Sequence, residues 1–190
     1  MTIKNSVEVK NLSVQFGDFF AVKNITFDVK KWETIAFVGP SGSGKSTIAL
    51  LLARLYDVDE GEILINDINI KRYDLVSLRN KMAFVPQDVF LFSESIYNNI
   101  VFGLNEDKKA NQQEVDDAAK AADIYDNICA FPMGYQTQIG ERGITLSGGQ
   151  KQRLSIARAL IKKPQLLILD DCLSAVDTST ENRILNNLKA

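Results

Sequence analysis

The chain has 190 residues, of which 45% are hydrophobic and 24% charged, with 22 basic residues, 24 acidic residues and no histidine. This composition is typical of one globular domain with its own core, and the net charge of −2 argues against a nucleic-acid-binding protein, which is usually basic. No apolar run approaches the roughly 18 residues that span a membrane, and the N-terminal MTIKNSVEVK lacks the apolar core of a secretory signal.

The first third of the chain predicts strands, one loop and one helix. Residues 7–30 contain two β-rich pieces separated by turn signals, and we expect antiparallel strands there. The short apolar run TIAFV at 34–38 is typical of a buried parallel strand. It leads into GPSGSGKST and then into an amphipathic helix, whose apolar face is formed by Ile48, Leu51, Leu52 and Leu55.

Further elements follow in the middle of the chain. Residues 61–67 alternate as a half-buried strand does, and residues 81–88 hold a short strand that Pro86 ends. Residues 89–145 differ in character, and we interpret them as a helical insertion. Within it, residues 113–128 predict one helix, with an apolar face formed by Val115, Ala118, Ala119, Ala122 and Ile128.

The last part of the chain predicts a helix and a second buried strand. Residues 147–163 have the pattern of a helix that begins at Ser147 as its N-cap and ends before Pro164. The buried strand QLLILD, at 165–170, follows at once. Two parallel strands, each coupled to a helix, imply an α/β core.

These elements predict a single domain over residues 1–190. We expect an N-terminal antiparallel β-subdomain and an α/β core, formed together by residues 1–88 and 146–190. Residues 89–145 would form an inserted α-helical subdomain.

One glycine-rich stretch between a predicted strand and a predicted helix carries a chemical signal. Residues 39–46 match G-x-x-x-x-G-K-[ST], the phosphate-binding loop (P-loop) of nucleotide hydrolases. Glycines let backbone N–H groups turn inward around phosphate oxygens, and the helix N-terminus adds positive charge. Lys45 would reach the β- and γ-phosphates, and the Ser46 hydroxyl would ligate Mg²⁺. The predicted ATP-binding residues here are Gly39, Pro40, Ser41, Gly42, Ser43, Gly44, Lys45, Ser46 and Thr47.

Four motifs in order resemble the ATP-binding cassette (ABC) ATPase family. Residues 146–150 read LSGGQ, the signature of that family, just upstream of the strand that ends in Asp170. Gln87 matches the family's glutamine loop, and residues 174–177, SAVD, resemble its SALD-type loop. The resemblance covers nearly the whole chain and is far more specific than the P-loop alone.

The resemblance implies an ATP site shared between two subunits. Ser147 opens a helix followed by two glycines, which is the chemistry of an anion site but also of an ordinary N-cap. In the family, this site closes on the γ-phosphate held by a second nucleotide-binding domain, in a head-to-tail arrangement with two composite sites. The signature residues implied in ATP binding are Ser147, Gly148, Gly149 and Gln150.

The resemblance also assigns residues around the metal and the adenine. Asp170 resembles the aspartate that holds Mg²⁺ through water. Gln87 would ligate Mg²⁺ or orient the attacking water, although a polar residue after a strand has simpler uses. Phe16 occupies the place where the family puts an aromatic ring against adenine; Phe19 or Phe20 could serve instead, or all three could belong to the core.

Two stretches resemble the exporter branch of the family, namely VPQDVFLFSESIYNNI at 85–100 and TQIGERG at 137–143. In exporters, the stretch before the signature contacts transmembrane helices that cross over from the partner. The resemblance therefore implies a transmembrane domain as partner, a location on the cytoplasmic face of the cell membrane, and no nucleic-acid partner.

Asp171 stands where the family usually has the glutamate that polarises the attacking water. The carboxylate is retained but lies one methylene, roughly 1–1.5 Å, further back, and a misplacement of about 1 Å can cost on the order of a hundredfold in rate. With Lys45 and Gln87, it forms the predicted catalytic set. Because the signature is complete, we interpret the chain as the degenerate half of a heterodimeric exporter. The alternatives are a homodimeric ABC exporter ATPase, either fully active or working slowly with aspartate, and a non-transport ABC ATPase.

The family's histidine loop has no counterpart in this sequence. The chain stops at Ala190 inside a helix-like stretch, before the strand that would carry that histidine. We therefore expect a fragment of a longer protein, with transmembrane helices upstream and the histidine strand downstream. Such a fragment would hydrolyse ATP weakly and expose an unpaired sheet edge.

Overall fold

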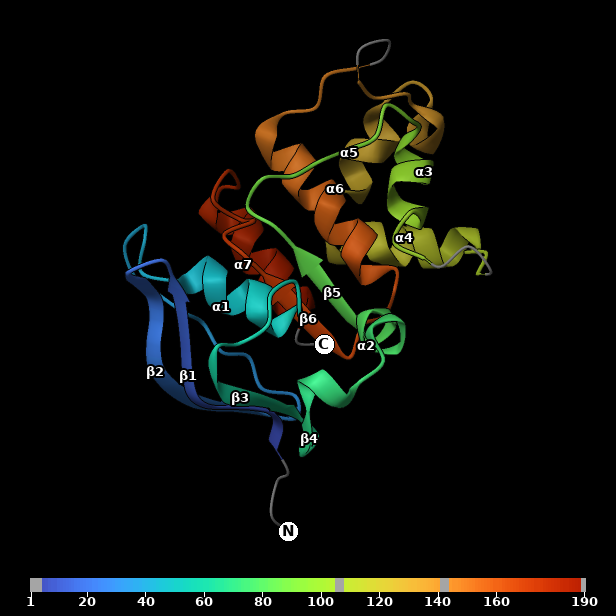
Figure 1. Cartoon of the computed structure of the whole chain (residues 1–190). Coiled ribbons are helices and arrows are strands. Elements are labelled where there is room, and N and C mark those ends of the chain that lie inside the picture. Colours follow the sequence, from blue (N-terminus) through green and yellow to red (C-terminus); the bar gives the residue numbers. More distant parts are fainter. Residues whose placement is uncertain (1–4, 105–107, 141–143, 189–190) are drawn as a thin grey trace. The chain divides into compact units, whose positions relative to one another are not determined.

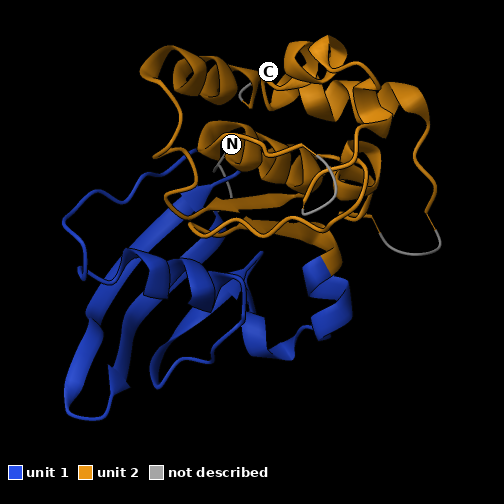
Figure 2. Ribbon diagram, turned by 90° about the horizontal axis from the view of Figure 1, so that it is seen from above, with its two compact units in different colours: residues 1–79 blue, residues 80–190 orange. Residues whose placement is uncertain are grey.

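A computed structural model describes residues 5–104, 108–140 and 144–188 (Figure 1). The chain divides into two compact units, residues 1–79 and 80–190, which Figure 2 distinguishes by colour. Each unit is described by itself. The mixture of an antiparallel sheet, a parallel strand pair and helices confirms the predicted α/β class. The subdomain boundaries at residues 88 and 145 stay a prediction.

The first unit is built on an antiparallel sheet with the strand order β2-β1-β3-β4. Its strands are β1 (Asn5–Phe16), β2 (Phe19–Lys30), β3 (Glu60–Ile65) and β4 (Ile68–Asn69). Val9 lies at the centre of this sheet, opposite Phe27 on one side and Ile63 on the other, and its side chain is fully buried. The strands predicted within residues 7–30 and 61–67 are thereby confirmed.

The same unit contains helix α1 (Lys45–Leu52) and a short 3-10 turn, η1 (Ile70–Arg72). Helix α2 (Leu75–Lys81) leads into the second unit. On α1 the predicted apolar face is buried at Ile48, Leu51 and Leu52. Leu55 lies beyond the helix end and is 48% exposed, so its predicted place on that face is wrong.

The buried parallel strand predicted at 34–38 does not form. These residues have no strand pairing, and Val38 is 95% exposed. Phe37 packs edge-on against the ring of Phe27, with 5.0 Å between the ring centroids. An apolar run becomes a strand only where its backbone finds a hydrogen-bonding partner. This run belongs to the unit whose sheet is antiparallel, while the described parallel strands belong to the other unit.

The second unit contains a parallel pair of strands, β5 (Met82–Val85) and β6 (Leu166–Leu169). Both were predicted, including the end of the first at Pro86. The helices of this unit are α3 (Ile96–Val101), α4 (Gln112–Ala121), α5 (Tyr125–Ala130), the 3-10 turn η2 (Gly134–Gln136), α6 (Gly148–Leu160) and α7 (Thr178–Asn187). The helices α3, α4 and α5 and the turn η2 lie within residues 89–145, and the described part of this range contains no named strand.

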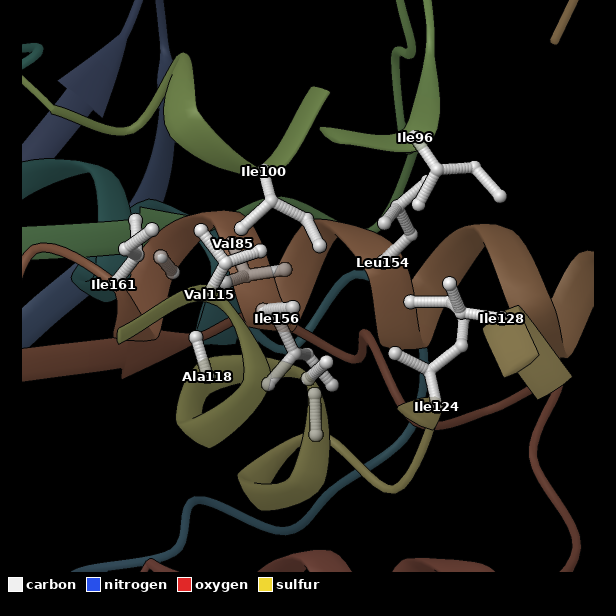
Figure 3. Close-up of a cluster of buried hydrophobic side chains, with 14 of the residues drawn as sticks. Val85, Ile96, Ile100, Val115, Ala118, Ile124, Ile128, Leu154, Ile156 and Ile161 are labelled. Atoms are coloured by element: carbon white, nitrogen blue, oxygen red, sulfur yellow. The ribbon is translucent and has the colours of Figure 1, made fainter. Parts of the chain in front are cut away.

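The core of this unit forms around α6, as Figure 3 shows. Leu154 and Ile156 of α6 are fully buried and belong to one cluster with Val85 of β5, Ile100 of α3 and Val115 of α4. The helix that begins at the signature thus forms the central support of the unit.

The single helix predicted at 113–128 is broken into α4 and α5. Asp123, between them, has a left-handed backbone with φ 55°. The break turns Ile124 and Ile128 into the core (Figure 3). The Asp123 carboxylate meanwhile accepts hydrogen bonds from Arg183 of α7. These tertiary contacts outweigh the continuous helical pattern.

None of the helices in the described ranges combines the length and the apolar character that crossing a bilayer requires. Of the stretch 137–143, which resembles exporters, residues 141–143 lie outside the described residues.

Candidate functional site

The P-loop of the first unit requires glycine at Gly44. This residue is the N-cap of α1 and has φ 87°, in the region that favours glycine. A Cβ atom here would lie 2.3 Å from the backbone oxygen of Ala21. Gly42 also has a positive φ, 79°. No side chain caps the N-terminus of α1, which is the arrangement of a helix start that binds an anion.

Lys45 lies folded over this loop. Its amine donates to the backbone oxygens of Gly39, at 2.6 Å, and Pro40, at 2.9 Å, and to the Ser43 hydroxyl, at 3.2 Å. An ammonium held by three oxygens over a glycine-rich turn can exchange these oxygens for those of a phosphate. Ser46 lies in the first turn of α1, exposed, and Thr47 follows it half-buried.

Three aromatic rings stand at the hairpin between β1 and β2. Phe16, the last residue of β1, is 53% exposed, and its ring lies edge-on to Tyr56. Phe19 and Phe20 are exposed as well. The alternative that all three belong to the core is therefore wrong, and each ring is available to a flat ligand.

In the second unit, the two predicted catalytic side chains are in contact. The backbone N–H of Asp170 donates to the Val85 oxygen at 2.9 Å, which extends the parallel ladder one residue beyond β6. Gln87 and the two aspartates therefore follow the carboxyl ends of neighbouring strands. The Gln87 side-chain amide donates to the Asp171 carboxylate at 3.1 Å. Asp171 is exposed and has a left-handed backbone, with φ 46°.

Ser147 is the N-cap of α6, as predicted. Its hydroxyl accepts from the N–H of Gln150 at 3.2 Å, and the Gln150 side chain accepts from the Ser147 N–H at 2.9 Å, which completes a capping box. Gly149 packs closely on the SAVD loop, because a Cβ atom there would lie 2.9 Å from the Ala175 oxygen.

The signature and the SAVD loop line one open groove of about 350 Å³. Its lining is formed by Ser147, Gly148, Gly149, Arg153, Ala175, Val176 and Asp177. Two motifs that are distant in sequence thus share a surface. The groove combines the N-terminus of α6 with a guanidinium, which together suit an anion.

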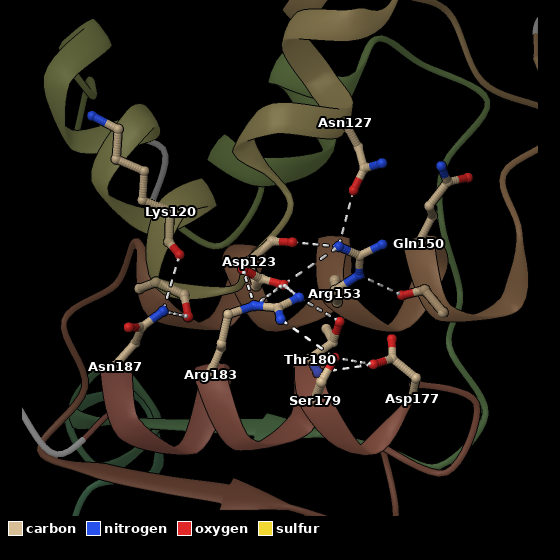
Figure 4. A network of polar contacts seen from close by, with 12 residues as sticks. Lys120, Asp123, Asn127, Gln150, Arg153, Asp177, Ser179, Thr180, Arg183 and Asn187 are labelled. Carbon is tan, nitrogen blue, oxygen red and sulfur yellow. Dashed lines mark hydrogen bonds and ion pairs between the residues drawn. The ribbon is translucent and has the colours of Figure 1, made fainter.

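Arg153 is a residue of this groove that the sequence analysis missed. Its guanidinium donates to the backbone oxygen of Asp123 and to the Asn127 side chain, at 2.9 Å (Figure 4). Burial lowers its pKa from the usual value. The only sequence signal for Arg153 was its position three residues after the end of the LSGGQ signature.

Asp177, at the other side of the groove, is the N-cap of α7. It accepts hydrogen bonds from the Ser179 hydroxyl at 2.6 Å and from the Thr180 N–H at 3.0 Å (Figure 4). These bonds hold the pKa of its carboxyl well below the usual range. Asp177 is therefore ionised at neutral pH and engaged in capping the helix.

An exposed aromatic surface, defined by Phe90, Phe92 and Phe102, was also missed. Phe90 is 68% and Phe102 60% exposed, and the Phe92 ring lies between them, 5.1 and 4.3 Å from their centroids. Large exposed apolar patches mark interaction surfaces. The sequence signal was the continuous apolar run at residues 89–92, which follows Gln87 closely.

Arg158 of α6 holds this aromatic surface in place. Its guanidinium donates to the backbone oxygens of Phe90 and Asn99, both at 2.8 Å, and to the Asn99 side chain at 2.7 Å. It also lies 5.4 Å from the Phe92 ring. Asn99 is fully buried and binds both the N–H and the oxygen of Phe92.

Comparisons with known proteins match this chain over most of its length. A model of the ABC transporter family matches residues 22–174. The multidrug resistance-like ATP-binding protein MdlA of Escherichia coli is 48% identical over 183 residues, which are 96% of this chain and 30% of that protein. ATP-binding cassette sub-family B member 6 of Mus musculus is 45% identical, over 97% of this chain and 22% of that protein.

A solved structure, that of a bacterial Atm1-family ABC exporter with ATP bound, is also similar to this chain. It is 45% identical, with a TM-score of 0.90, over 97% of this chain and 32% of that one. The chain therefore spans about a third or less of the length of these relatives.

Proposed function

This chain belongs to the ABC transporter family as a nucleotide-binding domain, and we propose that it binds MgATP as the motor of an exporter. The observation that carries the proposal is the P-loop with Lys45 folded over it. Gly44 leaves no room for a Cβ atom, and the amine of Lys45 already lies among three oxygens. The oxygens of a bound phosphate would replace these three acceptors of the Lys45 amine. Residues 39–47 would hold the phosphates, and Phe16 would stack on the adenine.

Three side chains are proposed to ligate Mg²⁺. Ser46, Gln87 and Asp170 supply a hydroxyl, an amide and a carboxylate, the donor types that magnesium accepts, while water and phosphate would complete its shell. No group of three His, Cys, Asp or Glu side chains gathers in the described ranges. The site accordingly fits an ion carried in with the nucleotide. When bound, the ion neutralises charge on the phosphates.

The signature would serve a second nucleotide-binding domain. Ser147, Gly148 and Gly149 line the groove together with Arg153 and Asp177, and Gln150 follows them in the first turn of α6. The helix N-terminus and the guanidinium would attract the γ-phosphate held by a partner, while the Asp177 carboxylate is engaged in capping α7. We propose that the two domains close head to tail on two ATP molecules. The 190-residue chain alone would then hydrolyse ATP weakly, because each site needs residues from both domains.

At this chain's own site, hydrolysis would be impaired. Asp171 is the proposed general base, Gln87 orients it, and Lys45 stabilises the phosphate charge. The carboxylate of Asp171 is shorter than glutamate by one methylene, and its hydrogen bond to Gln87 holds it on the side of that residue. We propose that the chain is the poorly hydrolysing half of a heterodimer, whose signature completes the active site on the partner. A homodimer that turns over slowly is the alternative.

The aromatic surface would contact the transmembrane domain. Phe90, Phe92 and Phe102 follow the glutamine loop and are presented by Arg158, so a shift of α6 moves the surface with it. This link supports coupling between ATP-driven closure and export. The domain would lie at the cytoplasmic face of the cell membrane, as the exporter relatives imply.

Binding of MgATP to the full-length protein tests the proposal. We expect the wild type to bind MgATP, Lys45→Met to weaken the affinity by about tenfold or more, and Lys31→Met, a surface change in the same unit, to leave it unaltered. Absence of binding by the wild type would overturn the proposal. DNA binding that weakens steeply with salt, without membrane association, would instead favour a non-transport ABC ATPase.

A further inference from the structure

A buried glutamine on α6 joins the signature helix to the loop after β6. Gln152 is only 7% exposed, although its side chain is an amide. Its oxygen accepts from the N–H of Ala175 at 3.0 Å, and its nitrogen donates to the Ser174 hydroxyl at 3.4 Å. Buried amides are costly unless both ends are satisfied, and here a single loop satisfies both.

The same loop holds Asp171. The Ser174 hydroxyl donates to the backbone oxygen of Asp171 at 3.0 Å, and the Asp171 carboxylate accepts from Gln87. Hydrogen bonds therefore run from Gln152 of α6 through the Ser174 hydroxyl to the backbone oxygen of Asp171. Gly149, one turn before Gln152, packs against the Ala175 oxygen and secures the loop at a second point.

The geometry points to Gln152 as a positioning residue for Asp171. The backbone of Asp171 is left-handed, which is an unfavourable conformation for aspartate and one that its surroundings must impose. Gln152 imposes it by fixing the two residues at the end of the turn. A base displaced by about 1 Å loses much of its rate, so the position of this loop decides turnover. The inference rests on the proposed role of Asp171 in hydrolysis.

A consequence concerns the two ATP sites. Ser147 caps α6 and Gln152 lies on it. Ser147 is proposed to contact the nucleotide held by the partner. Any shift of the helix on that nucleotide is carried by Gln152 to this chain's own carboxylate. Gln152 thereby links occupancy of one site to the geometry of the other.

Steady-state ATP turnover by the full-length protein with its partner tests this inference. Gln152→Met keeps the volume and removes both hydrogen bonds, while Gln152→Glu keeps the acceptor for the Ala175 N–H. We expect Gln152→Met to lower kcat by about tenfold or more with KM within about twofold, and Gln152→Glu to lie between it and the wild type. Gln113→Met, which removes an exposed amide contact of 2.7 Å to Asp117 on α4, should leave both constants unchanged.

A second background separates positioning from general packing. In Asp171→Asn, where the base is absent, Gln152→Met should lower the residual turnover no further, because both changes act on one group. Equal kcat for Gln152→Met and wild type, or an additive loss in the Asp171→Asn background, would overturn the inference and leave the proposed function standing. A wild type that neither binds nor hydrolyses ATP would overturn both.

Discussion

The Gln87 amide and the Asp171 carboxylate form a hydrogen bond of 3.1 Å although 84 positions separate them in the chain. The contact exists because β5 and β6 are parallel neighbours, so the residues that follow both strands meet at one edge. It ties the proposed base to a residue that is also a proposed Mg²⁺ ligand.

Loss of this bond should slow hydrolysis more than it weakens the MgATP affinity, to which Gln87 contributes as one of three proposed Mg²⁺ ligands. We expect Gln87→Met to lower kcat by about tenfold, because the Asp171 side chain is then free to rotate. Gln112→Met on α4 is the matched control, since Gln112 donates a similar bond of 2.8 Å to Asp116 far from the proposed site. Equal kcat in the two variants would contradict an orienting role for Gln87. Measurements of ATP turnover and of the MgATP affinity on the same variants test this prediction.

Gly44→Ala should abolish tight nucleotide binding. The new Cβ atom would meet the Ala21 oxygen at 2.3 Å, and alanine resists the positive φ as well, so the loop must shift. We expect the MgATP affinity to fall by about tenfold or more. Gly134→Ala shares the positive φ but meets nothing within 4 Å, so it controls for backbone strain alone. Titration with a fluorescent ATP analogue distinguishes the two, and unchanged affinity in Gly44→Ala would contradict the proposed cradle.

Trp32→Gly should stabilise the protein. Trp32 has φ 67° and is 92% exposed, in a turn closed by the Glu33 N–H and the Lys30 oxygen at 3.1 Å. Glycine relieves the left-handed strain, and we expect the free energy of unfolding to rise by about 1 kcal/mol. Trp32→Ala keeps the strain and should change little. Chemical denaturation measures both, and a loss of stability in Trp32→Gly would show that the indole makes a stabilising contact.

Arg158→Lys should be markedly destabilising. Lysine lacks the planar guanidinium fork that binds the backbone oxygens of Phe90 and Asn99 and the Asn99 side chain together. The buried Asn99 oxygens would lose hydrogen bonds, so we expect a loss of about 2 kcal/mol in the free energy of unfolding. Arg183→Lys makes the same change at an exposed ion pair with Asp123 and should cost much less. Comparable losses in both variants would contradict the anchoring role of Arg158.

The sequence predicts well what is encoded locally. The strands of residues 7–30 and the cap at Ser147 follow from alternation and from one capping residue, and each forms as expected. The absence of a strand at 34–38 and the helix break at Asp123 could not be predicted, because both depend on partners distant in the chain. The residues of the candidate site divide in the same way, into those with a local sequence signal and those that depend on distant partners.

The motifs indicate which residues carry chemistry, but not how they are joined. Gln152 and Arg153 have no signal of their own beyond their place after the signature. Their importance arises from the SAVD loop and from Asp123, which only the folded chain brings to α6.

The central claim, that the short carboxylate of Asp171 limits hydrolysis at this chain's own site, is tested most directly by Asp171→Glu. The measurement is ATP turnover of the full-length protein with its partner, with the P-loop lysine of the partner substituted so that only this chain's site is read. We expect a rise of about tenfold or more in kcat with KM unchanged, because the added methylene brings the carboxylate to the attacking water. Unchanged or lower turnover would contradict it.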